Sequence, residues 1–125
     1  YIVHLCFLIA YKYDTMSDLS KELIAATSTS MILSILREGE SYGYEITQRA
    51  RALSDGHVQY ADGTLYPILK RMEQRAWIES TWKKADSGRA RKYYAITAAG
   101  EEALAADIDQ WLIIMGILKK IWTAD

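Results

Sequence analysis

Three helical patterns followed directly by a short β-hairpin leave few folds open to this chain. Residues 78–83 and 91–97 are rich in β-branched and aromatic side chains, which is typical of strands, and the Asp-Ser-Gly sequence between them is typical of a turn. Ahead of this hairpin, apolar residues recur at helical spacing in three stretches, residues 17–38, 45–53 and 64–76. This order of elements predicts a helix-turn-helix that carries a β wing.

The fold class that we expect is mainly α with a small β-hairpin, a winged helix-turn-helix with N- and C-terminal dimerisation helices. Ser17 is expected to cap the first helix, because a hydroxyl there accepts a hydrogen bond from the first turn. Residues 41–44 are expected to form a turn. Thr64 is expected to cap the third helix, which places Pro67 in a first turn where its missing N–H is harmless. Thr97 is expected to cap the last helix.

The chain divides into three regions. Residues 16–100 are predicted to form the winged helix-turn-helix DNA-binding domain, including the first helix, and residues 101–125 a C-terminal dimerisation helix. Residues 1–15 are strongly apolar and precede Met16, so they are either an upstream or expression-derived segment or a genuine extension that packs on a partner. No run reaches the roughly 18 apolar residues of a membrane span, and the single cysteine, Cys6, fits a reducing compartment, so we expect a cytoplasmic protein with no membrane partner.

Charge is unevenly distributed along the 125 residues, although the net charge is only −1. Residues 1–40 carry three cations against five anions, residues 41–97 ten against six, and residues 98–125 two against five. The regional charges are therefore −2, +4 and −3. A basic middle between acidic ends suggests a segment that faces a polyanion, held by helices that do not.

The last helix carries the clearest periodicity in the chain. Its apolar residues alternate in steps of four and three: Leu104, Ile108, Trp111, Met115, Leu118 and Trp122. Such a seam is typical of paired helices, and apolar residues at 112–114 and 117 widen it beyond what one small domain buries. We therefore expect a homodimer. On this helix the predicted dimer interface consists of Ile108, Trp111, Met115, Leu118 and Trp122.

The third helix and the hairpin carry the chemistry that DNA binding needs. A major groove admits one α-helix, whose N-terminal residues reach base edges. Gly63 permits a close approach, and the hydroxyls of Thr64 and Tyr66 can bond bases or phosphates. Lys70 and Arg71 supply positive charge along the same edge. The hairpin tip adds five cations that suit the phosphate backbone or the minor groove: Lys83, Lys84, Arg89, Arg91 and Lys92.

Two tyrosines pose a choice between core packing and DNA contact. Tyr93 is expected to pack in the core, by its alternation with Trp82 across the hairpin. Tyr66 remains open between the two roles, because it lies beside the apolar stripe that contains Leu65 and Leu69.

Three ordered motifs resemble PadR-type transcriptional regulators, in particular the small subfamily that includes multidrug-responsive members. They are YGYEI at residues 42–46, GTLYPILKRME at 63–73 and GRARKYYAITAAG at 88–100. The resemblance implies a winged helix whose first and last helices build a homodimer, which adds Leu19 and Leu23 to the predicted dimer interface. It also implies a repressor that a small phenolic, aromatic or cationic drug-like molecule releases from DNA.

The resemblance also assigns roles by position. Tyr42 and Tyr44 match residues near the phosphate backbone, and Trp111 matches a tryptophan that faces its symmetry mate across a ligand pore. The predicted DNA-binding residues are Tyr42, Tyr44, Gly63, Thr64, Tyr66, Lys70, Arg71, Lys83, Lys84, Gly88, Arg89 and Lys92. The predicted ligand-binding residues are Trp111 and Met115. The family usually has glycine where this chain has Ala76; if the position needs a positive φ, alanine costs about 1 kcal/mol there.

The sequence contains no recognisable catalytic constellation. His4 and Cys6 lack further ligands for a metal ion, and no glycine-rich phosphate motif or nucleophile elbow is present. Glu101 and Glu102 are adjacent on a helix, so they point in different directions and make a poor acid–base pair. We expect no enzyme, no metal site and no cofactor.

The function that these patterns favour is sequence-specific DNA binding by a transcriptional regulator. The resemblance further implies a repressor released by a small hydrophobic or aromatic ligand at the dimer interface. Its partners would be double-stranded operator DNA, a second copy of the chain and a planar aromatic or drug-like effector. An alternative is a winged-helix protein-interaction module that docks a partner chain and does not bind DNA. A third is a ligand-sequestering protein built on the same dimer pore.

Overall fold

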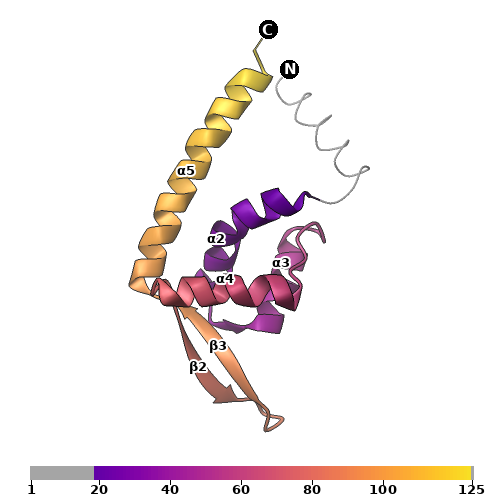
Figure 1. The fold of residues 1–125 in the computed structure, drawn as a ribbon, viewed down its shortest axis with the longest axis vertical. Coiled ribbons are helices and arrows are strands. Elements are labelled where there is room, and N and C mark those ends of the chain that lie inside the picture. Colours follow the sequence, from indigo (N-terminus) through magenta and orange to yellow (C-terminus); the bar gives the residue numbers. More distant parts are fainter. Residues whose placement is uncertain (1–18, 125) are drawn as a thin grey trace.

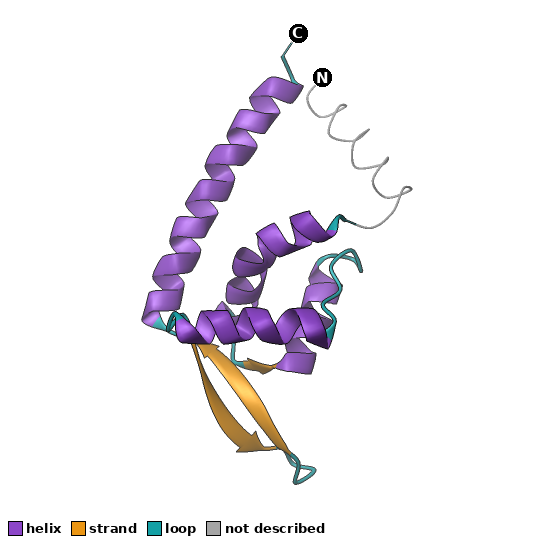
Figure 2. Cartoon of the chain, viewed as in Figure 1, coloured by secondary structure: helices purple, strands orange, loops and turns teal. Residues whose placement is uncertain are grey.

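The computed structural model describes residues 19–124 as a helical body with a hairpin at one end and a long helix rising from it (Figure 1). The elements in chain order are α2 (Lys21–Arg37), β1 (Ser41–Tyr42), α3 (Gly43–Leu53), α4 (Asp62–Gln74), β2 (Ile78–Lys84), β3 (Ala90–Ile96) and α5 (Ala98–Trp122). Four helices and one three-stranded antiparallel sheet confirm the predicted winged-helix class (Figure 2). The segment 1–15 and Ser17, for which predictions were made, lie outside the described residues.

Helix α2 is capped by Ser20, whose hydroxyl accepts a hydrogen bond from the Leu23 N–H at 3.2 Å. The prediction of Ser17 as the cap of this helix is therefore wrong. Both serines precede the same apolar pattern, and the sequence alone does not show which of them the chain uses. The helix ends at Arg37, two residues before the glycine that was expected to stop it.

A short strand replaces the turn that was expected at residues 41–44. Strand β1 pairs with β3, with Ser41 opposite Tyr94 and Tyr42 opposite Tyr93, so the sheet order is β1-β3-β2. The sequence prediction missed this strand because two residues are too few to show an alternating pattern. The strand places Tyr42 directly before the first turn of α3.

Helix α4 begins at Asp62, and Ala61 occupies the cap position without a side-chain hydrogen bond. Thr64 lies inside the first turn, so its prediction as the cap is wrong. Pro67 consequently falls in the second turn, where it leaves the Gly63 carbonyl without its usual donor. Because Gly63 is exposed, water can take that donor's place.

The hairpin register decides which tyrosine enters the core. Ser80 pairs with Tyr94 and Trp82 with Lys92, so Tyr94 shares a face with Trp82 and Tyr93 lies on the other face. Tyr94 is buried, whereas Tyr93 is half-buried and meets the Tyr42 ring edge-on, with centroids 5.4 Å apart. The expectation that Tyr93 packs in the core is therefore wrong by one residue.

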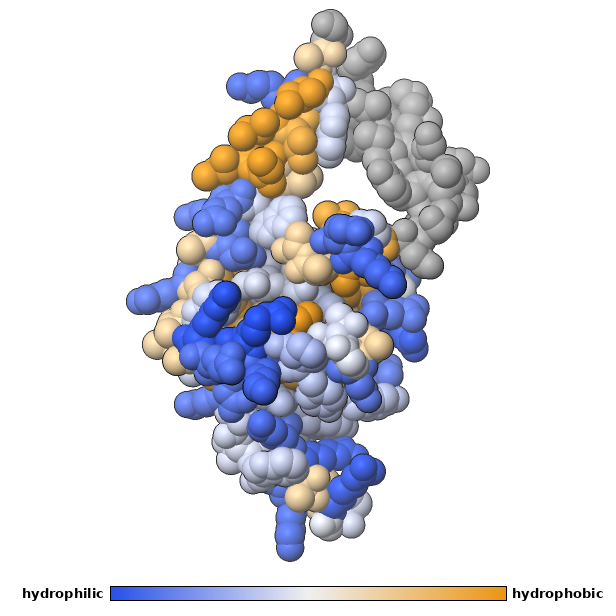
Figure 3. All heavy atoms as spheres, in the orientation of Figure 1, coloured by the Kyte–Doolittle hydropathy of each residue, from blue (hydrophilic) through white to orange (hydrophobic). Residues whose placement is uncertain are grey.

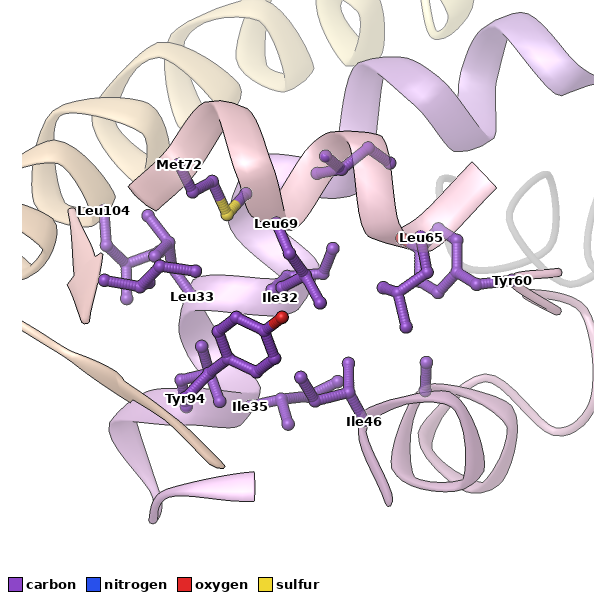
Figure 4. Packing of buried hydrophobic residues seen from close by; sticks show 14 of the residues in the cluster. Ile32, Leu33, Ile35, Ile46, Tyr60, Leu65, Leu69, Met72, Tyr94 and Leu104 are labelled. Atoms are coloured by element: carbon purple, nitrogen blue, oxygen red, sulfur yellow. The ribbon is translucent and has the colours of Figure 1, made fainter. Parts of the chain in front are cut away.

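The core lies where α2, α3 and α4 meet the body end of the hairpin (Figure 4). Residues from all four helices and β3 contribute to it, among them Ile32, Leu33, Ile35, Ile46, Leu65, Leu69, Met72, Tyr94 and Leu104. This arrangement fixes α4 and the base of the wing to one rigid body.

The start of α5 is locked against the link between α4 and β2. Thr97 caps α5 as predicted, accepting a hydrogen bond from the Gly100 N–H at 3.0 Å, and it donates one to the Ala76 carbonyl at 2.6 Å. A side chain on Gly100 would place a Cβ 2.0 Å from the Trp77 carbonyl oxygen, so the close approach requires glycine. Ala76 has a φ of 60°, so the condition for strain at this position is met.

Candidate nucleic-acid interface

A hollow of about 620 Å³ lies between the wing and the N-terminal parts of α3 and α4. Its lining combines five aromatic and three basic side chains with two small residues: Tyr42, Tyr44, Tyr66, Trp82, Tyr94, Arg89, Arg91, Lys92, Gly43 and Ala90. None of these lining residues is acidic. We call this surface the wing hollow.

The wing hollow brings together part of the predicted DNA-binding set. Tyr42, Tyr44, Tyr66, Arg89 and Lys92 line it. The remaining predicted residues lie outside it and are all exposed, on α4, on β2 or at the hairpin turn: Gly63, Thr64, Lys70, Arg71, Lys83, Lys84 and Gly88. The predicted set therefore spreads over the wing hollow, one exposed side of α4 and the wing tip.

Large aromatic side chains in the wing hollow are unusually exposed. Trp82 exposes 68% of its surface and Tyr44 exposes 66%. The register turns Trp82 toward the helical side of the sheet, but it lies on the part of β2 that extends past the core. Exposed aromatic groups of this size are typical of binding surfaces, because leaving them in water forgoes the free energy of burial.

Tyr66 packs against the start of α3 and also faces the wing hollow, and its contact with DNA stays a prediction. Its side chain is about half exposed and lines the wing hollow, so it is not a core residue. Its hydroxyl also lies against the start of α3, where a Cβ on Gly43 would be 2.6 Å from the Tyr66 Oη. Glycine at position 43 therefore lets α4 approach α3 closely at the edge of the wing hollow.

Arg91 is held over an aromatic ring. Its guanidinium carbon lies 4.4 Å from the centroid of Tyr42, a cation–π contact across the strands. Within residues 19–124, Arg91, Arg89 and Lys84 form no ion pair, so their charges are not neutralised by a neighbouring carboxylate.

Two carboxylates tie the wing to the body through its lysines. Glu73 of α4 accepts a hydrogen bond from the Ser80 hydroxyl at 2.6 Å and lies 3.6 Å from the Lys92 ammonium. Glu40, just before β1, pairs with Lys83. These contacts brace both strands of the hairpin, so Lys83 and Lys92 face their carboxylate partners as well as solvent.

Tyr94 closes the floor of the wing hollow beside this cluster. Burial raises the pKa of the Tyr94 phenol, and the negative charge of Glu73 raises it further, with a smaller effect from Tyr66. The phenol therefore stays neutral at physiological pH and can donate a hydrogen bond but carries no charge that would repel an anion.

Trp82 and Gly43 line the wing hollow but are not among the predicted DNA-binding residues, and Arg91 was predicted only as one of the hairpin cations. The alternation of Ile78, Ser80 and Trp82 was recognised, but it gave no sign that the wing extends past the body and leaves the tryptophan exposed.

The predicted ligand-binding residues, Trp111 and Met115, lie on α5, away from the wing hollow (Figure 1). Trp111 is half-buried and Met115 is exposed. The same part of α5 presents a broad apolar face, visible in orange in Figure 3, with Leu112 67% and Ile113 65% exposed.

The predicted dimer seam divides into two parts along α5 and α2. Leu104 is buried, and Leu19 and Ile108 pack against the core, so these positions serve the domain's own interior. The other predicted interface residues are half-buried or exposed: Leu23, Trp111, Met115, Leu118 and Trp122.

Two further observations concern residues 19–124 as a whole. No group of three or more His, Cys, Asp or Glu side chains in this part of the chain is placed to hold a metal ion. None of the helices in the same range is long and apolar enough to cross a membrane.

Comparison with known proteins identifies a family. The model of the "Transcriptional regulator PadR-like family" matches residues 32–106. The transcriptional regulator Rv3488 of Mycobacterium tuberculosis is 38% identical over 76 residues, which cover 61% of this chain and 67% of that protein. An uncharacterised protein of Lysinibacillus sphaericus is 31% identical over 97 residues, covering 78% of this chain and 89% of that protein.

Solved structures agree with this assignment. A transcriptional regulator from Clostridium thermocellum superposes with a TM-score of 0.73 at 30% identity, covering 80% of this chain and 97% of that chain. A PadR-like transcriptional regulator from Bacillus cereus gives a TM-score of 0.73 at 28% identity, covering 84% of this chain and all of that chain. Family and fold therefore point to the same class of protein.

Proposed function

The chain belongs to the PadR-like family of transcriptional regulators, and from this premise we propose that it is a homodimeric repressor released from operator DNA by a small ligand. Regulation through DNA binding follows from the family, whose members are generally not enzymes. The observation that carries the proposal furthest is the wing hollow, where cations and exposed aromatic rings meet without a lining carboxylate. The alternative of an interaction module that does not bind DNA is not favoured.

In the proposed complex, α4 enters the major groove and the wing follows the backbone. Gly63, Thr64 and Lys70 of α4 are exposed along the side that would face the bases. Lys84 and Arg89 of the wing form no ion pair within the described residues, so they are free to approach phosphates. The neutral Tyr94 phenol, which also lines the wing hollow, carries no charge that would oppose this approach.

The proposed dimer uses the apolar face of α5 together with α2. That face exposes Leu112, Ile113 and Ile121 to more than 60% each, and a second copy would cover it. A two-fold dimer would place two copies of α4 in successive major grooves, roughly one helical turn apart. The operator would then be a pseudo-palindrome.

The proposed ligand is hydrophobic or aromatic and contacts Trp111 and Met115 between the two copies of α5. An indole at a two-fold axis can stack on a planar ring. Because α5 continues directly from the wing through Thr97, a ligand that changes the angle between the helices would also change the spacing of the DNA-binding heads.

Fluorescence anisotropy tests the DNA-binding part of the proposal. The promoter fragment upstream of the chain's own gene is titrated against a scrambled duplex over a salt series. We expect the promoter to bind about a hundredfold more tightly or better, with affinity falling steeply as salt rises. Lys84→Glu combined with Arg89→Glu should abolish binding, whereas Lys21→Glu, an exposed charge reversal on α2, should not. No binding to either duplex at low salt would overturn the proposal.

A screen of planar aromatic compounds tests the release step. An effector should dissociate the wild-type complex, and Trp111→Ala should lose that response while it still binds promoter DNA. Equal DNA binding with and without every compound that binds between the α5 helices would refute ligand control.

A further inference from the structure

We propose that the wing hollow holds the sugar–phosphate backbone of one DNA strand, and that Trp82 is a DNA-contacting residue that packs on a deoxyribose. This inference rests on the DNA-binding function proposed above. It adds a partner for a side chain that neither the sequence motifs nor the comparisons assign to DNA.

The walls of the wing hollow match the alternating chemistry of a DNA strand. Each nucleotide presents an anionic phosphate and then the apolar C–H face of a sugar. The lining offers cations in Arg89, Arg91 and Lys92, and exposed aromatic faces in Trp82 and Tyr44. Charge attraction to phosphates explains the cations of this surface but does not explain its exposed indole.

The wing hollow has two sides, and a strand would run between them. Trp82 and Lys92 are opposite each other in the hairpin register and form the wing side. Tyr44 and Tyr66 form the helical side, at the starts of α3 and α4. The tight packing of Tyr66 on Gly43 fixes the helical side in place. Because the aromatic walls are exposed, the site suits an extended chain better than a compact small molecule, which would need enclosure.

Trp82 has no evident structural role that would otherwise explain it. It lies past the core on β2, exposes 68% of its surface and is absent from the residues that pack against the core. Replacing it should therefore leave the fold intact. This property makes it possible to test binding separately from stability.

Salt dependence separates the two kinds of contact in the wing hollow. A cation that neutralises a phosphate releases counterions, so its loss lowers the slope of log affinity against log salt by about one. An indole that packs on a sugar releases no counterion, so its loss weakens binding equally at every salt concentration.

The experiment measures anisotropy of the labelled promoter duplex between about 50 and 200 mM salt. We expect Trp82→Ala to weaken binding about tenfold with an unchanged salt slope, by analogy with other aromatic contacts to nucleic acids. Arg89→Ala should lower the slope by about one. Trp82→Phe keeps an aromatic face and should recover most of the affinity. Thr81→Ala, the neighbouring exposed residue on the other face of β2, should bind as the wild type does.

The outcomes distinguish this inference from the function on which it rests. If the wild type binds no duplex at low salt, both fail. If the wild type binds but Trp82→Ala has the same affinity and an unaltered melting temperature, only the inference fails. If Trp82→Ala reduces the salt slope as Arg89→Ala does, sugar packing is refuted. If the wild type binds single strands more tightly than duplex, the site stacks on unpaired bases and the inference is again overturned.

Discussion

The wing end of the molecule and the far end of α5 both expose side chains that a folded domain usually buries, yet their surroundings differ. At the wing, Trp82 and Tyr44 lie among arginines and lysines. Along α5, Leu112 and Ile113 lie among further aliphatic residues, and the cations appear only at the last turn. Exposed apolar surface alone therefore does not indicate a class of partner. The cations around the exposed aromatic groups of the wing favour a polyanion as partner. The aliphatic neighbours along α5 favour an apolar protein surface.

Gly100 lies where the start of α5 packs against Trp77, at the base of the wing. Its substitution should have the largest effect on stability. Gly100→Ala would force a Cβ to within 2.0 Å of the Trp77 carbonyl oxygen, so α5 must move away from the base of the wing. We expect a loss of about 3 kcal/mol in the free energy of unfolding, measured by chemical denaturation.

Gly116→Ala is the matched control in the same helix. Outside the local backbone of α5 no atom lies within 4 Å of the added Cβ at that position, so the better helix propensity of alanine should stabilise the protein by up to about 1 kcal/mol. Equal effects of the two substitutions would show that α5 does not press on Trp77.

A charge introduced on the apolar face of α5 should weaken self-association, whereas a charge reversal on the wing should not. Met115→Glu places a carboxylate on the proposed interface, where an unpaired charge is costly to bury. We expect self-association, measured by sedimentation equilibrium, to weaken more than tenfold. Lys84→Glu at the wing should leave it unchanged. A monomeric wild type would refute the dimer, and an unaffected Met115→Glu dimer would place the interface elsewhere.

Local chemistry explains which parts of the fold were predictable from the sequence. The helices, the hairpin and the Thr97 cap depend on periodicity, turn residues and a hydroxyl, all of which act over a few residues. Strand β1 was missed because Ser41 and Tyr42 become a strand only through pairing with β3. The start of α4 was misplaced because Ala61 offers no capping side chain and Pro67 lies deeper in the helix than usual.

The candidate site was predictable to the extent that its residues were charged or in motifs. Arg89, Lys92 and the tyrosines could be found that way. Trp82 could not, because its exposure depends on how far the hairpin extends beyond the core. The pairing of Lys83 with Glu40 was equally inaccessible, since the two residues are 43 positions apart and meet only in the fold.

Ala76 offers a smaller change at the root of the wing. Its φ of 60° is unfavourable for a residue with a Cβ, so Ala76→Gly should stabilise the protein by about 1 kcal/mol without altering DNA affinity. Ala106→Gly, at an exposed position within α5, should have the opposite sign because glycine weakens an ordinary helix by about the same amount. A loss of stability in Ala76→Gly would mean that the positive φ is not strained.

The smallest expected effect concerns the ion pair that Lys83 of the wing forms with Glu40. Glu40 pairs with Lys83 on the exposed surface, where such a pair contributes at most about 1 kcal/mol to folding. Glu40→Gln should free the lysine for a phosphate, raising duplex affinity two- to threefold, roughly, and steepening the salt slope by up to about one. Thermal stability should hardly change.

Glu38→Gln is the control for this substitution. It removes the same charge two residues earlier, but its partner Arg49 also donates to Ser41 and is not part of the proposed interface. If both variants raise affinity equally, the cause is the general reduction of negative charge near the DNA. If only Glu40→Gln does so, Glu40 competes with DNA for Lys83. The wing would then differ from α5 in a further respect, because DNA must displace a carboxylate of the protein itself in order to bind.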